Sequence, residues 1–264
     1  MRTTGLVVLA AGLLLAGACG GDNSGSSVNT SATTAAGAAT GAPTTATSAA
    51  NASTSDPRTQ QQLDADRATA QNAVLKLADL PTGWIGTPAT DTADTDLQQQ
   101  MSACIGSDLS NKSPTRVESD DFADPNDTMT ASNSVSVLPS TAANNAAMDT
   151  FMNAKVPGCL AQAMDSAISK NLASSDTTLP QGTTIGKAEA ATESFPNVAD
   201  RTAAYRVTVP VQANGITLKI SADFVAFTKG RAGATLALQG QGSPFPSDLA
   251  TSLAQTVAGR LPTT

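Results

Sequence analysis

Apolar and polar residues alternate over residues 201–240, and this pattern predicts three antiparallel strands. Asn214-Gly215 has the residues of a two-residue type I′ turn, which joins the first two strands into a hairpin. A slip of one residue would turn the apolar set towards water, so turn and pattern together predict one register. Its pairs are Ala213 with Ile216, Val211 with Leu218, Val209 with Ile220, Val207 with Ala222, Tyr205 with Phe224, and Arg206 with Asp223.

The third strand, residues 232–240, follows a predicted loop at residues 229–231. A loop of three residues places Leu236 and Leu238 on the same face as Phe224. We therefore expect one apolar face shared by all three strands.

Pro210 predicts the order of these strands. In the hairpin register it stands opposite Lys219, and its missing amide hydrogen lies on the side away from the hairpin. The first strand is therefore predicted to be an edge near Pro210, with the second strand in the centre of the sheet.

Apolar residues at intervals of three and four predict helices in the rest of the domain, and shorter alternating runs predict two more strands. The expected helices are residues 66–78, 95–105 and 141–155, one that begins at Cys159, and one that Ser247 caps and that extends to Leu261. The expected strands are residues 129–138 and 184–195. Together these elements predict an α+β fold in which an antiparallel sheet, with a C-terminal three-strand meander, packs against several helices.

The first residues resemble a bacterial lipoprotein signal. Met1-Arg2 is positive, residues 6–15 are apolar, and small residues precede Cys19. In that family the cysteine thiol carries a diacylglycerol and the preceding peptide is removed; Ala16 departs from the leucine that the family favours there. A plain secretory signal is the alternative, since an apolar run of about ten residues is too short to span a membrane.

These features divide the chain into three regions. Residues 1–18 are the predicted signal peptide, residues 19–56 a lipidated cysteine and low-complexity tether, and residues 57–264 a single sensor-like α+β domain. A random tether of this composition spans on the order of 35 Å. We expect the Cys19 lipid, with its palmitate chains, to hold the domain at the extracytoplasmic face of the cell membrane.

Charge and composition exclude several functions. The formal net charge of −7 offers no basic stripe for nucleic acid. The chain has no histidine, which removes the Ser-His-Asp triad and every histidine metal site. We expect no catalytic residue, no metal and no cofactor.

With Cys19 assigned to lipid, Cys104 and Cys159 remain. In an exported protein they predict one disulfide, which joins the end of one helix to the start of another. A catalytic cysteine is the alternative, but no histidine is present to activate it.

An acidic segment at residues 118–127 has two further interpretations. Clustered carboxylates suit Ca²⁺, although the spacing fits no calcium loop and Pro125 interrupts it. Asp120 and Asp121 are also the candidates for a glycosidase-like pair. We favour a solvated turn between strands.

Trp84, Tyr205 and Arg206 are the candidates for a ligand surface. Trp84 is the single tryptophan, and its alternative role is to pack over the edge of the core. Tyr205 belongs to the predicted apolar face, and Arg206 has Asp223 as an alternative partner across the hairpin.

The order of parts resembles actinobacterial envelope lipoproteins that are similar to the extracellular sensor domain of mycobacterial receptor serine/threonine kinases. The resemblance covers residues 67–261 and rests on the sequence Leu77-Ala78-Asp79-Leu80-Pro81-Thr82-Gly83-Trp84, the paired cysteines and the late meander. It implies an antiparallel sheet with helices on its faces and a groove for an unknown ligand. That sensor domain carries two disulfides, whereas Cys104 and Cys159 allow only one here.

Two functions follow as hypotheses. The first is a non-catalytic, lipid-anchored binding or sensor-like module that takes an unknown small envelope ligand or a protein partner. The second is an envelope interaction or assembly factor that acts through the predicted exposed edge near Pro210.

Overall fold

The computed structural model describes residues 56–89, 95–107, 113–174 and 182–263. The predicted signal peptide, Cys19 and all but the last residue of the predicted tether lie outside these residues. The assignments of those parts of the chain therefore stay predictions.

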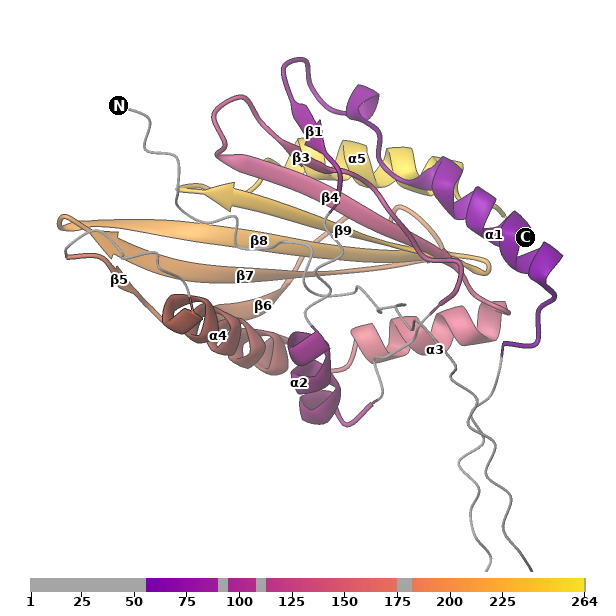
Figure 1. Cartoon of the computed structure of the whole chain (residues 1–264), viewed down its shortest axis with the longest axis horizontal. Helices are drawn as coiled ribbons and strands as arrows, with labels where there is room; N and C mark the ends of the chain where they lie inside the picture. The colour runs from indigo at the N-terminus through magenta and orange to yellow at the C-terminus, as the bar shows by residue number, and fades with distance from the viewer. Residues whose placement is uncertain (1–55, 90–94, 108–112, 175–181, 264) are drawn as a thin grey trace, which may run out of the picture. The chain divides into compact units, whose positions relative to one another are not determined.

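An antiparallel sheet of nine strands is at the centre of the described residues (Figure 1). Its order is β1-β3-β4-β9-β8-β7-β5, with β2 paired to β4 and β6 paired to β7. The strands are β1 (Ile85–Thr87), β2 (Val117–Glu118), β3 (Asp121–Ala123), β4 (Met129–Val137), β5 (Thr184–Ile185), β6 (Glu189–Glu193), β7 (Arg201–Ala213), β8 (Ile216–Lys229) and β9 (Ala232–Gln241).

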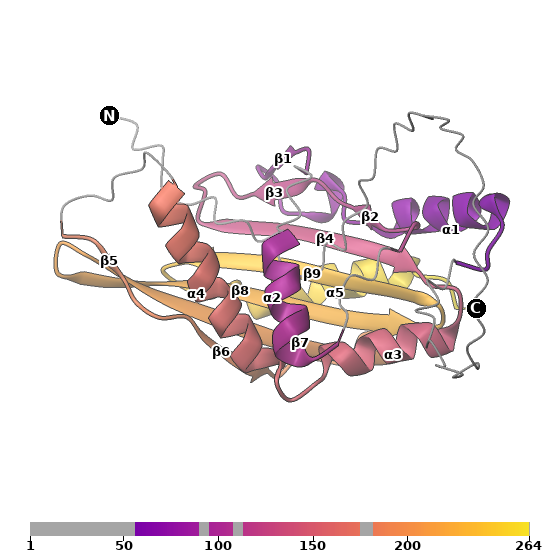
Figure 2. The ribbon, with the colours of Figure 1, turned by 60° about the horizontal axis from the view of Figure 1, so that its bottom comes forward.

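Helices cover both faces of this sheet, which confirms the predicted α+β fold. α1 and α5 lie over one face, called here the first face, while α2, α3 and α4 lie over the second face (Figures 1 and 2). Within the described residues, no helix has the length and apolar content needed to cross a bilayer. The helices are α1 (Gln60–Ala73), α2 (Thr95–Ile105), α3 (Thr141–Phe151), α4 (Val156–Ser174) and α5 (Ser247–Arg260), with a short 3-10 helix at Leu77–Asp79.

The register predicted for the β7–β8 hairpin is confirmed at every pair. Ala213 pairs with Ile216 across the turn, and Tyr205 pairs with Phe224 further along. Asn214 has a φ of 52° and Gly215 a φ of 77°, as a type I′ turn requires. Local turn chemistry and side-chain alternation were therefore sufficient to predict the register of this hairpin.

The third strand is confirmed as β9, but the predicted loop before it and the predicted face of its leucines are wrong. The β8–β9 turn has two residues, because Lys229 pairs with Ala232. Leu236 consequently pairs with Val225, so it lies on the face opposite Phe224. The expectation of a single apolar face failed because helices cover both faces, and the apolar run from Phe224 to Phe227 serves the two faces alternately.

The prediction of an edge strand at Pro210 is also wrong. β7 has neighbours on both sides, since β5 pairs with its end and β6 with its middle. The outer neighbour is interrupted opposite Pro210, where only the Gly186 amide donates, to the Pro210 carbonyl oxygen at 2.7 Å. The missing proline amide hydrogen thus breaks the neighbouring strand in two but does not leave β7 unpaired.

The first face carries the larger apolar core. Leu236, Leu238 and Phe227 project from the central strands and are fully buried. Their partners on the helices above are Ala70 and Ala73 of α1 and Ala250, Leu253, Ala254, Val257 and Ala258 of α5. Packing of these two helices on the sheet holds this face together.

The second face carries a smaller core and a covalent link. Tyr205, Val207 and Phe224 pack beneath α4 and α2. Cys104 in the last turn of α2 and Cys159 in the first turn of α4 form a disulfide, with their Cα atoms 5.7 Å apart. The bridge joins the two helices as predicted from the sequence.

Several helix boundaries differ from the prediction. α1 begins at Gln60, where Thr59 and Gln62 form a capping box, and it ends at Ala73, so Leu77 is exposed rather than part of its buried stripe. α3 ends at Phe151, short of residue 155, and α4 begins at Val156 with its proline in the first turn. Ser247 is the first residue of α5, not its cap.

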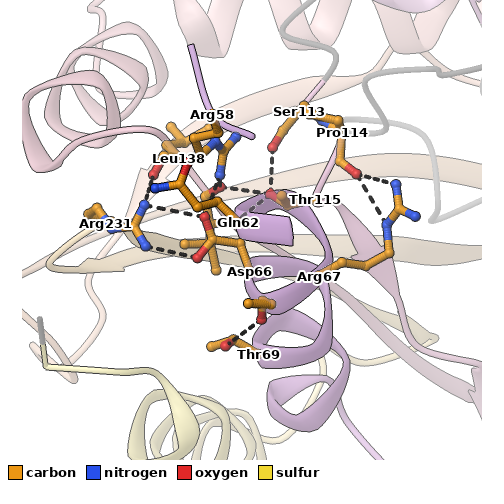
Figure 3. A network of polar contacts seen from close by, with 12 residues as sticks. Arg58, Gln62, Asp66, Arg67, Thr69, Ser113, Pro114, Thr115, Leu138 and Arg231 are labelled. Atoms are coloured by element: carbon orange, nitrogen blue, oxygen red, sulfur yellow. Dashed lines mark hydrogen bonds and ion pairs between the residues drawn. The ribbon is translucent and has the colours of Figure 1, made fainter. Parts of the chain in front are cut away.

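A polar network fixes the segment that enters the domain (Figure 3). The Arg58 guanidinium donates to the Asp66 carboxylate and to the Val137 carbonyl oxygen, both at 2.7 Å. Arg231, from the β8–β9 turn, donates to the other Asp66 oxygen at 2.8 Å. Asp66 is a buried residue of α1, so two arginines neutralise its charge and tie the start of the domain to the sheet.

Candidate functional site

Trp84 lies in the first-face core. Its side chain is buried, and its ring meets Phe245 edge to face with centroids 6.3 Å apart. Gly83, with a φ of 98°, makes the turn that directs the indole inward. Trp84 therefore serves as a packing residue, the alternative that the sequence left open.

Tyr205 lies on the second face, also buried. Its hydroxyl donates to the Phe151 carbonyl oxygen at 2.8 Å, and the two rings are 5.1 Å apart. Burial raises the pKa of the Tyr205 hydroxyl. These contacts fasten α3 to the sheet and leave no ring face for a ligand.

Arg206 forms a bidentate pair with Asp223, with N···O distances of 2.6 and 2.9 Å, and contacts Glu193 at 3.1 Å. The hydrogen bond to Asp223 is the main reason that the pKa of Arg206 is raised, with burial opposing it. Two carboxylates thus engage this guanidinium on the first face, so its charge is already balanced within the protein.

The structure does not bring the three predicted ligand residues together. Trp84 and Arg206 are on the first face, whereas Tyr205 is on the second. Each side chain is occupied by the contacts described above. The prediction that they contact a ligand remains untested, but they do not form one site.

The acidic segment forms the short strands β2 and β3 and a tight turn before β4, so the predicted turn between strands is present, although Asp124 within it is buried. The Asp124 carboxylate accepts hydrogen bonds from the Asn126, Thr128 and Met129 amides at 2.6 to 3.2 Å. Burial raises the pKa of Asp124, but these amides lower it by more, so the net shift is downward. Asp124 is a turn-forming residue, and no group of three or more metal-ligating side chains occurs within the described ranges.

Asp121 has a different environment at the start of β3. Burial is the main reason that its pKa is raised; the Ser132 hydroxyl, which donates to it, opposes the shift, and Glu118 and Asp120 add to it. Glu118 is held by Arg116 through bonds of 2.9 and 3.0 Å. This arrangement does not give Asp120 and Asp121 the roles of an acid and a base that face one substrate.

A feature that the sequence did not reveal is a row of polar side chains on the second face. On β4 every even position carries a hydroxyl, and the register places Thr130 opposite Gln239 and Ser134 opposite Thr235 on β9. Opposite side chains in such pairs are about 5 Å apart at Cβ. We call this set the polar patch; it consists of Thr130, Ser132, Ser134, Ser136, Thr235 and Gln239.

Most of the polar patch is not used by the fold. Among the described residues, only Ser132 has a side-chain hydrogen bond, the one it donates to Asp121. The amide of Gln239 has no such partner in the described part of the chain, although the residue is only 5% exposed. Buried and half-buried polar groups normally find partners, so these atoms are available to a ligand or to water.

The side chains of the polar patch are uncharged, and the carboxylates of Asp121 and Glu118 lie at its edge, beside Ser132 and opposite Ser134. Hydroxyls donate and accept, and the Gln239 amide does both, so the set suits a ligand with several hydroxyl or amide groups. The signal in the sequence is the alternation Thr-Ala-Ser-Asn-Ser-Val-Ser at residues 130–136, which also fits a solvent-facing strand. The patch differs from the outer side of a solvent-facing strand only in its position, because β4 lies beside β9 in the sheet and the larger core covers its other face.

The comparisons with known proteins add one structural likeness. No family model and no curated protein matches the chain. Among solved structures, the chain is similar to the extracellular domain of PknH from Mycobacterium tuberculosis, with a TM-score of 0.34 and 10% identity over 74% of this chain and 95% of that chain. At this identity and TM-score the likeness indicates no function for this chain.

Proposed function

We propose that the chain is a lipid-anchored, extracytoplasmic module that binds a polar ligand and does not catalyse a reaction. The observation that carries the proposal is the polar patch, whose hydroxyl and amide groups, apart from the Ser132 hydroxyl, are left without side-chain hydrogen-bond partners among the described residues. A ligand with several hydroxyl or amide groups would satisfy them.

Export is supported by two features that are far apart in the chain. The signal-like start ends at Cys19, and the folded domain contains the bridge between Cys104 and Cys159. Disulfides persist in oxidising compartments outside the cytoplasm. Both features favour a position at the outer side of the cell membrane, with the Cys19 lipid as the anchor.

Binding is favoured over catalysis by the residue types present. The chain has no histidine, and the disulfide occupies Cys104 and Cys159. The carboxylates next to the patch hydroxyls are Asp121, which accepts a hydrogen bond from Ser132, and Glu118, which stands opposite Ser134 and is engaged by Arg116. Its residues lie on paired central strands, which gives a rigid surface for recognition.

Mass spectrometry of the protein purified from its own membrane tests both parts of the proposal. The intact mass should correspond to a chain that begins at a lipidated Cys19, and the variant Cys19→Ser should lose that added mass. Under native conditions we expect a further, non-covalent mass that is lost on denaturation.

The double variant Ser134→Val plus Thr235→Val removes two patch hydroxyls and places valine, which favours strands, at both positions. We expect at least a tenfold loss of the non-covalent mass, which corresponds to about 1.4 kcal/mol. Thr208→Val removes a strand hydroxyl on the first face and is the matched control. Equal occupancy in both variants, or no bound mass in the wild type, would contradict binding at the polar patch.

A further inference from the structure

The β7–β8 turn exposes two large aliphatic side chains. Ile216 is 64% exposed and Leu218 is 51% exposed, although both belong to a strand. β9 ends opposite Ile220, and the Gly242 amide donates to the Lys219 carbonyl oxygen at 2.8 Å. Residues 216–218 of β8 therefore pair only with β7, which β5 flanks as far as Gln212, and the turn forms the tip of this end of the sheet (Figures 1 and 2). This end is a narrow, tightly turned projection with an apolar side.

The register sets the direction of these side chains. Leu218 pairs with Val211 and Ile216 with Ala213, so all four lie on the second face. Lys219, the residue after Leu218, lies on the opposite side of the hairpin, beside Pro210. The projection is therefore apolar on one side and cationic on the other.

The charge of this end is opposite to that of the whole chain. The protein has 22 acidic and 15 basic residues, yet residues 182–188 and 207–222 contain Lys187 and Lys219 and no aspartate or glutamate; Glu189 follows this segment, and the Asp165 carboxylate accepts from the Ala188 amide. Both lysines are exposed, and within the described ranges neither makes an ion pair. An anionic surface would attract this end and repel most of the rest of the molecule.

The dimensions of the projection suit a lipid surface. Lys219 is four residues beyond Gly215, which is about 13 Å along a strand. Interfacial segments bury their apolar side about 5–10 Å into the boundary between headgroups and acyl chains. With Ile216 and Leu218 at that depth, the lysine ammonium groups reach the level of the phosphates.

We propose that the β7–β8 turn inserts Ile216 and Leu218 into an anionic lipid surface, with Lys187 and Lys219 on the headgroup phosphates. This inference builds on the proposed lipid anchor, because the predicted tether, if random, would span about 35 Å and keep the domain within reach of the bilayer. Docking would fix the orientation of the domain and hold the second face at a set distance from the membrane.

Flotation with lipid vesicles tests the docking without the anchor. The mature chain carrying Cys19→Ser should float with vesicles of phosphatidylglycerol and phosphatidylcholine but not with phosphatidylcholine alone. Ile216→Asn plus Leu218→Asn should weaken the binding roughly tenfold or more, as expected for aliphatic side chains that leave the lipid. Lys187→Gln plus Lys219→Gln should weaken it at low salt, and added salt should have the same effect on the wild type.

The matched control is Ile85→Asn, which replaces an isoleucine 62% exposed on β1, at the other end of the strand order. It should float as well as the parent chain. Depth is read from Leu218→Trp: brominated acyl chains should quench its fluorescence, while buried Trp84 gives a constant background. Sedimentation of each variant shows whether the turn instead joins two copies.

Failure of the docking and failure of the anchor give different results. Absence of flotation, equal flotation of the tip and Ile85 variants, or a change of oligomeric state caused by the tip substitutions would each overturn the docking. If the wild-type protein lacks the lipid mass but the Cys19→Ser chain still binds vesicles through the β7–β8 turn, the docking proposal is supported and the anchor proposal is contradicted.

Discussion

The two faces of the sheet are held together in different ways. The first face is covered by α1 and α5, and its central side chains are large aliphatic and aromatic groups without solvent exposure. The second face has a smaller apolar core under α2 and α4, which a disulfide joins, and its remaining part is lined by the hydroxyls of β4. The larger apolar core is on the first face, and the row of hydroxyls, most of them without partners, is on the second.

This difference explains how a chain with few aromatic residues can fold although part of its sheet carries hydroxyls instead of apolar side chains. Burying hydroxyls in place of leucines gives up about 1.5–3 kcal/mol of transfer free energy per side chain. The larger first-face core and the covalent bridge offset that loss. The second face is therefore the part in which substitutions should affect binding more than folding.

The largest expected effect is loss of the disulfide. Cys104→Ala plus Cys159→Ala opens a link across 55 residues, which the chain-entropy treatment puts at about 4 kcal/mol of unfolding free energy. Chemical denaturation of the variant beside the wild type measures it. A loss below about 1 kcal/mol would mean that packing, not the bridge, holds α2 and α4 on the second face.

The next effect concerns the first-face core. Leu236→Ala leaves a cavity among fully buried side chains and should cost about 3 kcal/mol. Leu218→Ala, the same substitution at the exposed hairpin end, should cost less than about 1 kcal/mol. Similar losses for the two variants would show that the first face is not the main source of stability.

A third effect is a pH-dependent contact between α5 and the short 3-10 helix that follows α1. Arg260 donates to both oxygens of Asp79, at 2.5 and 2.7 Å. Burial raises the pKa of Asp79, but the bonds from Arg260 and from the Lys76 amide lower it by more. Because the folded-state pKa is depressed, this stabilisation is present above the unfolded pKa and is lost as pH falls through the folded pKa.

Asp79→Asn should cost about 2 kcal/mol near neutral pH and progressively less as the pH falls below about 4. Unfolding curves of the wild type and the variant across this range give the difference. A difference that grows in acid would have the wrong sign and would contradict the assignment.

The smallest expected effect on stability is at the polar patch. Ser134→Val plus Thr235→Val should change the free energy of unfolding by less than about 1 kcal/mol, since no described partner loses a hydrogen bond. The same variant should lose bound ligand. A large destabilisation would show that these hydroxyls serve the fold and not a ligand.

The sequence predicted features that depend on neighbouring residues better than features that depend on segments distant in sequence. The hairpin followed from Asn214-Gly215 and the alternation beside it, because a turn and its flanking residues determine each other. The side of the sheet that Leu236 faces did not follow, since it depends on helices distant in sequence. The start of α1 was missed although Thr59 and Gln62 carry a capping signal.

The candidate site was predicted less well than the fold. Trp84, Tyr205 and Arg206 were selected as residue types common in binding sites, but packing and ion pairing engage all three. The serines of β4 carry no such signal, because a strand facing solvent has the same alternation. Only the pairing of β4 with β9 brings Gln239 and Thr235 to them.

Hydrogen–deuterium exchange of the protein purified from its own envelope tests the central claim most directly, before and after mild denaturation and refolding to remove bound ligand. If the polar patch binds that ligand, exchange should be slower before removal in β4 and β9 and unchanged in α5 and β1. Equal exchange in β4 and β9, or protection confined to the first face, would contradict the assignment of binding to the second face.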